Sequence, residues 1–152
     1  MPTNEKRSPR FIIGCRHEGR SFLVSIKGYS SILQKKVIGE ISDDHRKGLK
    51  VIFDCCNIPW ESWTTLSELI EQNQEEKVAE ILNQVDNTGQ SYLERNFIRK
   101  SLASMEVAQK ESSTILQQAE QLTDEQRFYV EIINKHCQNE IEIWKEIAEY
   151  FL

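Results

Sequence analysis

The spacing of apolar residues changes character near the middle of the chain. After Pro59 there is no further proline and a single glycine, Gly89, and apolar residues recur with the period of an amphipathic helix. The first part of the chain instead contains short runs rich in β-branched and aromatic residues. We therefore predict a helical region over residues 59–152, preceded by a region of different structure.

The clearest helical pattern begins at Thr123. Projected at about 100° per residue, the apolar side chains of this segment fill about half of the circumference. This face is wider than one neighbouring helix would cover, and it stays apolar to the end of the sequence. We expect the end of this helix to contact a partner. The predicted partner-binding residues are Trp144, Ile147, Tyr150 and Phe151.

Capping patterns divide the helical region into four helices. Two short helices follow Pro59 and end at the turn 86–89. Ser91–Glu94 and Thr123–Gln126 each have the spacing of a capping box, and they open two long helices. A long antiparallel hairpin of these two helices is predicted, with one uninterrupted helix of ~60 residues as the alternative.

The pattern of residues 11–58 predicts a small sheet. Phe11–Cys15 and Ser21–Ile26 are short runs of β-formers, and the polar residues 16–20 between them include Gly19, which suits a hairpin loop. Leu49–Cys56 has apolar Val51 and Phe53 on one side and predicts a third strand. The predicted fold class is α+β, mostly helical, with this sheet followed by the helices.

The predicted domain organisation has three parts. Residues 1–10 contain few apolar residues and several charges, which is typical of a disordered polar arm. Residues 11–58 form the sheet region, and residues 59–152 form the helical region. At 152 residues, these two regions are expected to share one compact domain.

Charge and hydropathy exclude several classes of protein. The net charge of −5 and the pI near 5.3 argue against a nucleic-acid binder that works through a broad basic face. No apolar run approaches the ~18 residues of a membrane span, and a signal-peptide pattern is lacking. We therefore expect a cytoplasmic protein without a membrane partner, with its four cysteines as reduced thiols.

The sequence contains no motif for nucleotide chemistry. The glycines lack the spacing of a phosphate loop or a dinucleotide-binding turn, and there is no His-Glu-x-x-His metalloprotease motif. No cofactor is expected.

Two groups of residues could carry metal or catalytic chemistry. His136 and Glu140 are one turn apart on the last helix, with Cys137 beside them, which is a spacing that can share a metal or a proton. Cys15 and His17 could approach Cys55-Cys56 at one end of the sheet. The favoured interpretation is a hydrogen-bonded polar layer for the first group and small buried thiols for the second.

These observations favour a non-enzymatic protein–protein interaction or regulatory protein that uses helix faces of its C-terminal half. An acidic inhibitor of a basic partner, such as an immunity protein, would be one form of it. The expected partner is another protein or a second copy of the chain, as in a homodimer. The alternative is a small metal-binding protein or enzyme that uses His136, Glu140 and a cysteine.

Overall fold

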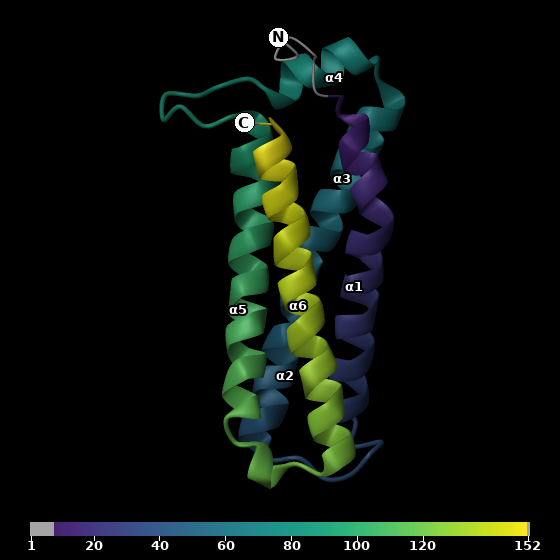
Figure 1. The fold of residues 1–152 in the computed structure, drawn as a ribbon, viewed down its shortest axis with the longest axis vertical. Coiled ribbons are helices and arrows are strands. Elements are labelled where there is room, and N and C mark those ends of the chain that lie inside the picture. Colours follow the sequence, from purple (N-terminus) through teal and green to yellow (C-terminus); the bar gives the residue numbers. More distant parts are fainter. Residues whose placement is uncertain (1–7, 152) are drawn as a thin grey trace.

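Four antiparallel helical rods form the molecule in the computed structural model, which describes residues 8–151 (Figure 1). The first rod is α1 (Arg10–Gln34), the second consists of α2 (Asp43–Cys55) and α3 (Asn57–Gln72), and the last two are α5 (Arg99–Leu116) and α6 (Asp124–Phe151). The short α4 (Glu75–Leu82) crosses the end of the bundle at which α1 begins and α6 ends.

The contacts between helices define a closed ring. α6 packs against α1 and α5, and both of these pack against the rod made of α2 and α3. The buried apolar side chains form a core along the axis that these four rods enclose. An amphipathic helix gains most of its stability from burying its apolar face in this way, because isolated helices are marginal in water.

The predicted α+β fold class is wrong, because the described residues contain no strand or sheet. The predicted hairpin of Phe11–Cys15 and Ser21–Ile26 lies within α1, and the predicted strand Leu49–Cys56 lies in α2 and its C-cap. In α1 the fully buried residues follow a helical rather than an alternating period. They are Ile12, Gly19, Leu23, Ile26, Ser30 and Leu33.

Gly19 explains much of this error. It lies within α1, where a Cβ atom would come within about 2.5 Å of Trp63 Cε2 on α3. The residue is therefore small because two helices approach closely there, and no loop needs it. A glycine in a helix weakens the local helical signal, so close packing and a turn are difficult to distinguish in one sequence.

Local signals set the ends of the first two helices. Lys36 has φ = 60°, and the amide of Val37 donates to Ile32 O at 3.4 Å, which closes α1 with a Schellman-type turn. Ser42 caps α2 by accepting a hydrogen bond from the His45 amide at 3.1 Å. The sequence Ser42-Asp43-Asp44 is thus a helix start with acids in the first turn.

Both predicted capping boxes are at helix starts. The Glu94 amide donates to Ser91 Oγ at 3.1 Å, before a π-helical turn, η2 (Glu94–Ile98), that leads into α5. Thr123 and Gln126 cap each other reciprocally, with distances of 2.9 and 3.1 Å. A 3₁₀ turn, η3 (Ala119–Gln121), separates α5 from α6, so the two long helices form the predicted hairpin.

The junction between α2 and α3 is stabilised by a side chain from α5. Pro59 has no amide hydrogen, so the carbonyl of Cys55 loses the donor that a continuous helix would supply. Ser104 Oγ donates to this carbonyl at 2.6 Å. The hydroxyl therefore satisfies the acceptor that proline leaves free, and it fixes α5 against the junction.

Gly19→Ala and Gly28→Ala should change stability in opposite directions. A Cβ at Gly19 would clash with Trp63, whereas a Cβ at Gly28 would meet no atom within 4 Å. We expect Gly19→Ala to lower the free energy of unfolding by about 1–2 kcal/mol, since overpacking outweighs the gain in helix propensity. Gly28→Ala should raise it by up to about 1 kcal/mol. Urea denaturation followed by circular dichroism measures both, and a stabilised Gly19→Ala protein would contradict the proposed packing.

Ser104→Ala should destabilise the bundle by about 1–2 kcal/mol, because the Cys55 carbonyl would lose its donor. Thr114→Ala, which removes an exposed hydroxyl on the same helix, should change stability by less than about 0.5 kcal/mol. In a Pro59→Ala background, an amide hydrogen can again reach Cys55 O, so the effect of Ser104→Ala should shrink. An equal effect in both backgrounds would refute the role assigned to the hydroxyl.

Candidate functional site

The predicted partner-binding residues divide into two groups. Trp144 and Ile147 are fully buried inside the bundle, and the Trp144 ring stacks on Trp63 with ring centroids 4.3 Å apart. Tyr150 and Phe151 are partly buried at the end of α6, where the Tyr150 ring stacks on Phe11 at 4.1 Å. The wide apolar face of α6 is therefore covered along much of its length by α1, α5 and the core.

The predicted pair of His136 and Glu140 points to two different places. The Nδ1 atom of His136 lies 2.7 Å from Ser25 Oγ on α1. Burial lowers the pKa of His136, and Lys135 lowers it further. Glu140 instead enters the core, where Trp63 Nε1 donates to its Oε1 at 3.2 Å. The two side chains thus belong to separate hydrogen-bonded contacts, one to α1 and one to α3.

Glu140 lies in an apolar environment. Its side chain is fully buried, and Oε2 has no hydrogen-bond partner among the described residues. Burial raises the pKa of Glu140 from an ordinary value of 4.5 to about 8, although the Trp63 hydrogen bond favours the charged form. At neutral pH the carboxyl is mostly protonated, so the core contains a neutral acid and no charge.

The buried cysteines are protonated as well. Burial raises the pKa of Cys56 to about 12, and burial raises the pKa of Cys137 even further. A thiolate is the nucleophilic and metal-binding form of cysteine, and this environment opposes it. Within residues 8–151 no three His, Cys, Asp or Glu side chains are grouped so that they could hold a metal ion.

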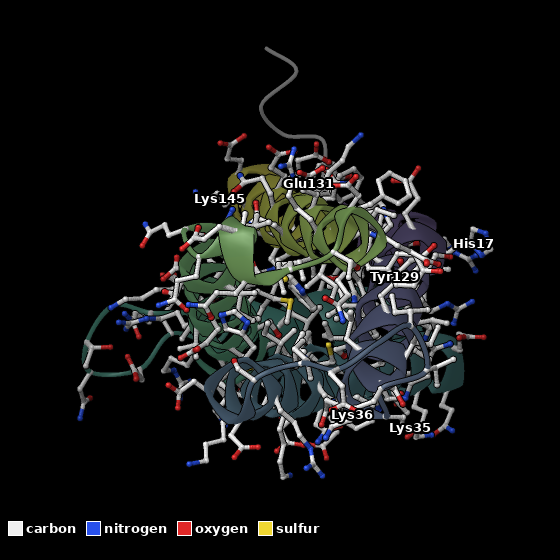
Figure 2. The ribbon with its side chains drawn as sticks, turned by 90° about the horizontal axis from the view of Figure 1, so that it is seen from below. His17, Lys35, Lys36, Tyr129, Glu131 and Lys145 are labelled. Atoms are coloured by element: carbon white, nitrogen blue, oxygen red, sulfur yellow. The ribbon has the colours of Figure 1, made fainter. Side chains whose placement is uncertain are left out.

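The other predicted ligand pair is also separated. Cys15 is partly buried, and burial together with the negative charge of Glu146 on α6 raises its pKa. His17 lies at the outer side of α1 and points away from the bundle (Figure 2). Residues two apart point in directions about 200° apart in a helix, whereas in a strand they lie on the same side. Because this segment is helical, Cys15 and His17 point in different directions.

Trp60 was expected from the sequence to belong mainly to the core, as most aromatic residues do, and it was not among the predicted binding residues. Trp60 follows Pro59 on α3 and remains 38% exposed, whereas Trp63 and Trp144 are fully buried. The guanidinium of Arg20 lies over the Trp60 ring, 5.3 Å from its centroid, and Arg20 also donates to Thr64 Oγ1 at 3.3 Å. Arg20 therefore connects α1 to α3 at the molecular surface.

A shallow groove runs along the outer side of α1 next to this contact. We call it the α1 groove, and it is lined by Ile13, Arg16, His17, Arg20, Ser21 and Val24. Val24 is 59% exposed, and Arg16 pairs with Glu71 of α3 at 2.6 Å. These residues share one side of α1 at helical spacing. The sequence contained this signal, but treating residues 16–20 as a loop concealed it.

No protein-family profile, curated protein or solved structure matches this chain. In residues 8–151, none of the helices is both long enough and apolar enough to pass through a bilayer.

Ionisation of Glu140 should make stability depend on pH. Since its pKa is raised in the folded state, the unfolded chain loses this proton first, and stability should fall as pH rises from about 4.5 to about 8. The slope should reach at most about 1.4 kcal/mol per pH unit. The lowered pKa of His136 opposes this decline, but its effect fades above pH 6.5, and the raised pKa values of the cysteines act mainly above pH 8.

Glu140→Gln should remove this decline between pH 6.5 and 8, because the amide keeps an acceptor for Trp63 and cannot ionise. Glu142→Gln, at an exposed position two residues away, should retain the decline. Urea denaturation at a series of pH values measures both proteins. A wild-type stability that rises over this interval would show that the buried carboxyl is ionised.

Proposed function

We propose that this protein is a non-enzymatic interaction or regulatory protein and that its working surface is the α1 groove together with Trp60. The observation that carries this proposal is the partly exposed Trp60 under the Arg20 guanidinium, in a bundle whose two other tryptophans are fully buried. Tryptophan and arginine are the residues most enriched among those that dominate binding energy at interfaces.

The surroundings of Trp60 support this role. Val24 on α1, one turn after Arg20, is 59% exposed and lines the α1 groove, so apolar surface is available beside Arg20. Exposed apolar surface rimmed by polar groups is typical of a protein-binding site. Tyr150 and Phe151 were predicted to bind a partner, and they remain a second contact region of this proposal at the far end of α6.

No specific observation favours the enzyme or metal-binding alternative. His136 and Glu140 contact different helices, and the core thiols are held in their protonated form. The polar groups of the interior form hydrogen bonds with one another or contact apolar side chains, whereas Trp60 and the α1 groove face outward.

Trp60→Ala should strongly reduce the capture of specific partners while leaving the fold intact. The native protein and the variant would be used as affinity baits in an extract of the source cells, with captured proteins quantified by mass spectrometry. Phe128→Ala is the matched control, because Phe128 is 57% exposed on α6 and lies outside the α1 groove. Partners of the interface should fall at least about tenfold with Trp60→Ala only.

Thermal unfolding of each bait would verify folding before capture. If the Trp60→Ala bait is folded and retains the same specific partners as the native protein, the α1 groove and Trp60 are not the working surface.

A further inference from the structure

Charge is divided unequally between α1 and the rest of the bundle. α1 contains Arg10, Arg16, Arg20 and Lys27 against the single acid Glu18, which gives a net charge of +3. Residues 35–151 contain 13 Lys or Arg and 22 Asp or Glu, which gives a net charge of −9. The α1 groove therefore lies on a basic helix of an acidic protein, whereas α3, which contains Trp60, has three Glu and no Lys or Arg.

Part of this positive charge is not neutralised within the fold. Arg16 pairs with Glu71, but within residues 8–151 no ion pair involves Arg20 or Lys27. Arg20 is held by Trp60 and Thr64, and the ammonium of Lys27 lies 4.8 Å from the centre of the Phe53 ring. Both cations are thus held beside aromatic rings, where a carboxylate from another molecule could reach them.

The net positive charge is concentrated on α1, and this limits which kinds of molecule could bind the α1 groove. A symmetric dimer through α1 would place two helices of charge +3 against each other, which is unfavourable. A long polyanion such as nucleic acid would extend beyond α1 over surface with a net charge of −9. A short acidic segment fits, because Arg16, His17 and Arg20 line the α1 groove and no Asp or Glu among the described residues lines it.

Apolar side chains flank the cations in the same groove. Ile13 and Val24 lie at its two ends along α1, and Trp60 lies beside Arg20. An occupant that matches both features has apolar side chains at helical spacing and acids between them. We propose that the α1 groove binds a short acidic amphipathic helix of another protein. This inference rests on the proposed function and specifies its partner.

The first experiment measures the local charge with Trp60 as the probe. Fluorescence quenching by iodide and by caesium would be compared, since Trp60 is the exposed one of the three tryptophans. Iodide should quench the accessible fraction better than caesium despite the net charge of −5. Trp60→Phe should remove that fraction, and Arg20→Gln should reduce the iodide preference. The control Lys110→Gln, an exposed cation on α5, should retain it.

The second experiment measures binding of three helical peptides of ~16 residues, which is long enough to span the groove. All three have the same leucine positions, and their polar positions are Glu, Gln or Lys. Titration of each fluorescently labelled peptide with the protein, followed by peptide anisotropy so that Trp60 variants can also be measured, should give the Glu peptide at least about tenfold tighter binding than the Gln peptide. Raising the salt from about 50 to about 300 mM should weaken it several-fold. Arg20→Gln should cause a similar loss, and Lys110→Gln should not.

The outcomes separate this inference from the proposed function. Equal binding of the Glu and Gln peptides, with both weakened by Trp60→Ala, would overturn the acidic partner and leave the working surface in place. Stronger quenching by caesium, no detectable binding of the Glu peptide, or self-association through the groove on sedimentation would also overturn the inference. If Trp60→Ala leaves both peptide binding and partner capture unchanged, the proposed function fails as well.

Discussion

Trp63 is held between the backbone of Gly19 on α1 and the ring of Trp144 on α6, and this contact sets the spacing of three of the four rods. The absent Cβ at Gly19 lets the indole lie against α1, and the Trp144 ring stacks on the indole with ring centroids 4.3 Å apart. The same indole donates to Glu140, so the position of the ring is restrained by its hydrogen bond as well as by packing. The remaining core side chains fill the space that this arrangement leaves.

Burying the carboxyl of Glu140 in that contact would cost desolvation free energy if the group were charged. The group is protonated at neutral pH, which avoids most of this cost. Burial beside Cys56, Cys137 and Trp144 disfavours the charged form far more than one hydrogen bond favours it, so the pKa of Glu140 is raised to about 8. A neutral acid with one hydrogen bond can still specify how α3 and α6 are aligned, because another alignment would leave Trp63 Nε1 without its acceptor.

The outer surface is organised by the same pair of helices that meets at Gly19. Where α1 and α3 approach closely, Arg20 reaches across to Thr64 and lies over Trp60, which faces solvent. Trp60 and Trp63 are three residues apart on α3, so their side chains point in directions about 60° apart. Trp63 is directed into the core, and Trp60 lies at the edge of the contact between α1 and α3. The close packing of Gly19 against Trp63 thus brings Arg20 within reach of Thr64 and Trp60 at the surface.

The sequence by itself determined the elements whose signals are local. The reciprocal cap of Thr123 and Gln126, the Ser91 cap and the helical period after Pro59 depend on neighbours within one turn, so the two short helices and the long hairpin could be predicted. Tertiary structure decided the rest. Gly19 and the β-forming runs around it suggest a hairpin by propensity, and only the indole of Trp63, 44 positions later, makes a helix there the better solution. The burial of Trp144, the isolation of Glu140 from His136 and the meeting of Arg20 with Trp60 likewise depend on contacts between distant segments, because such contacts arise only when complete helices pack together.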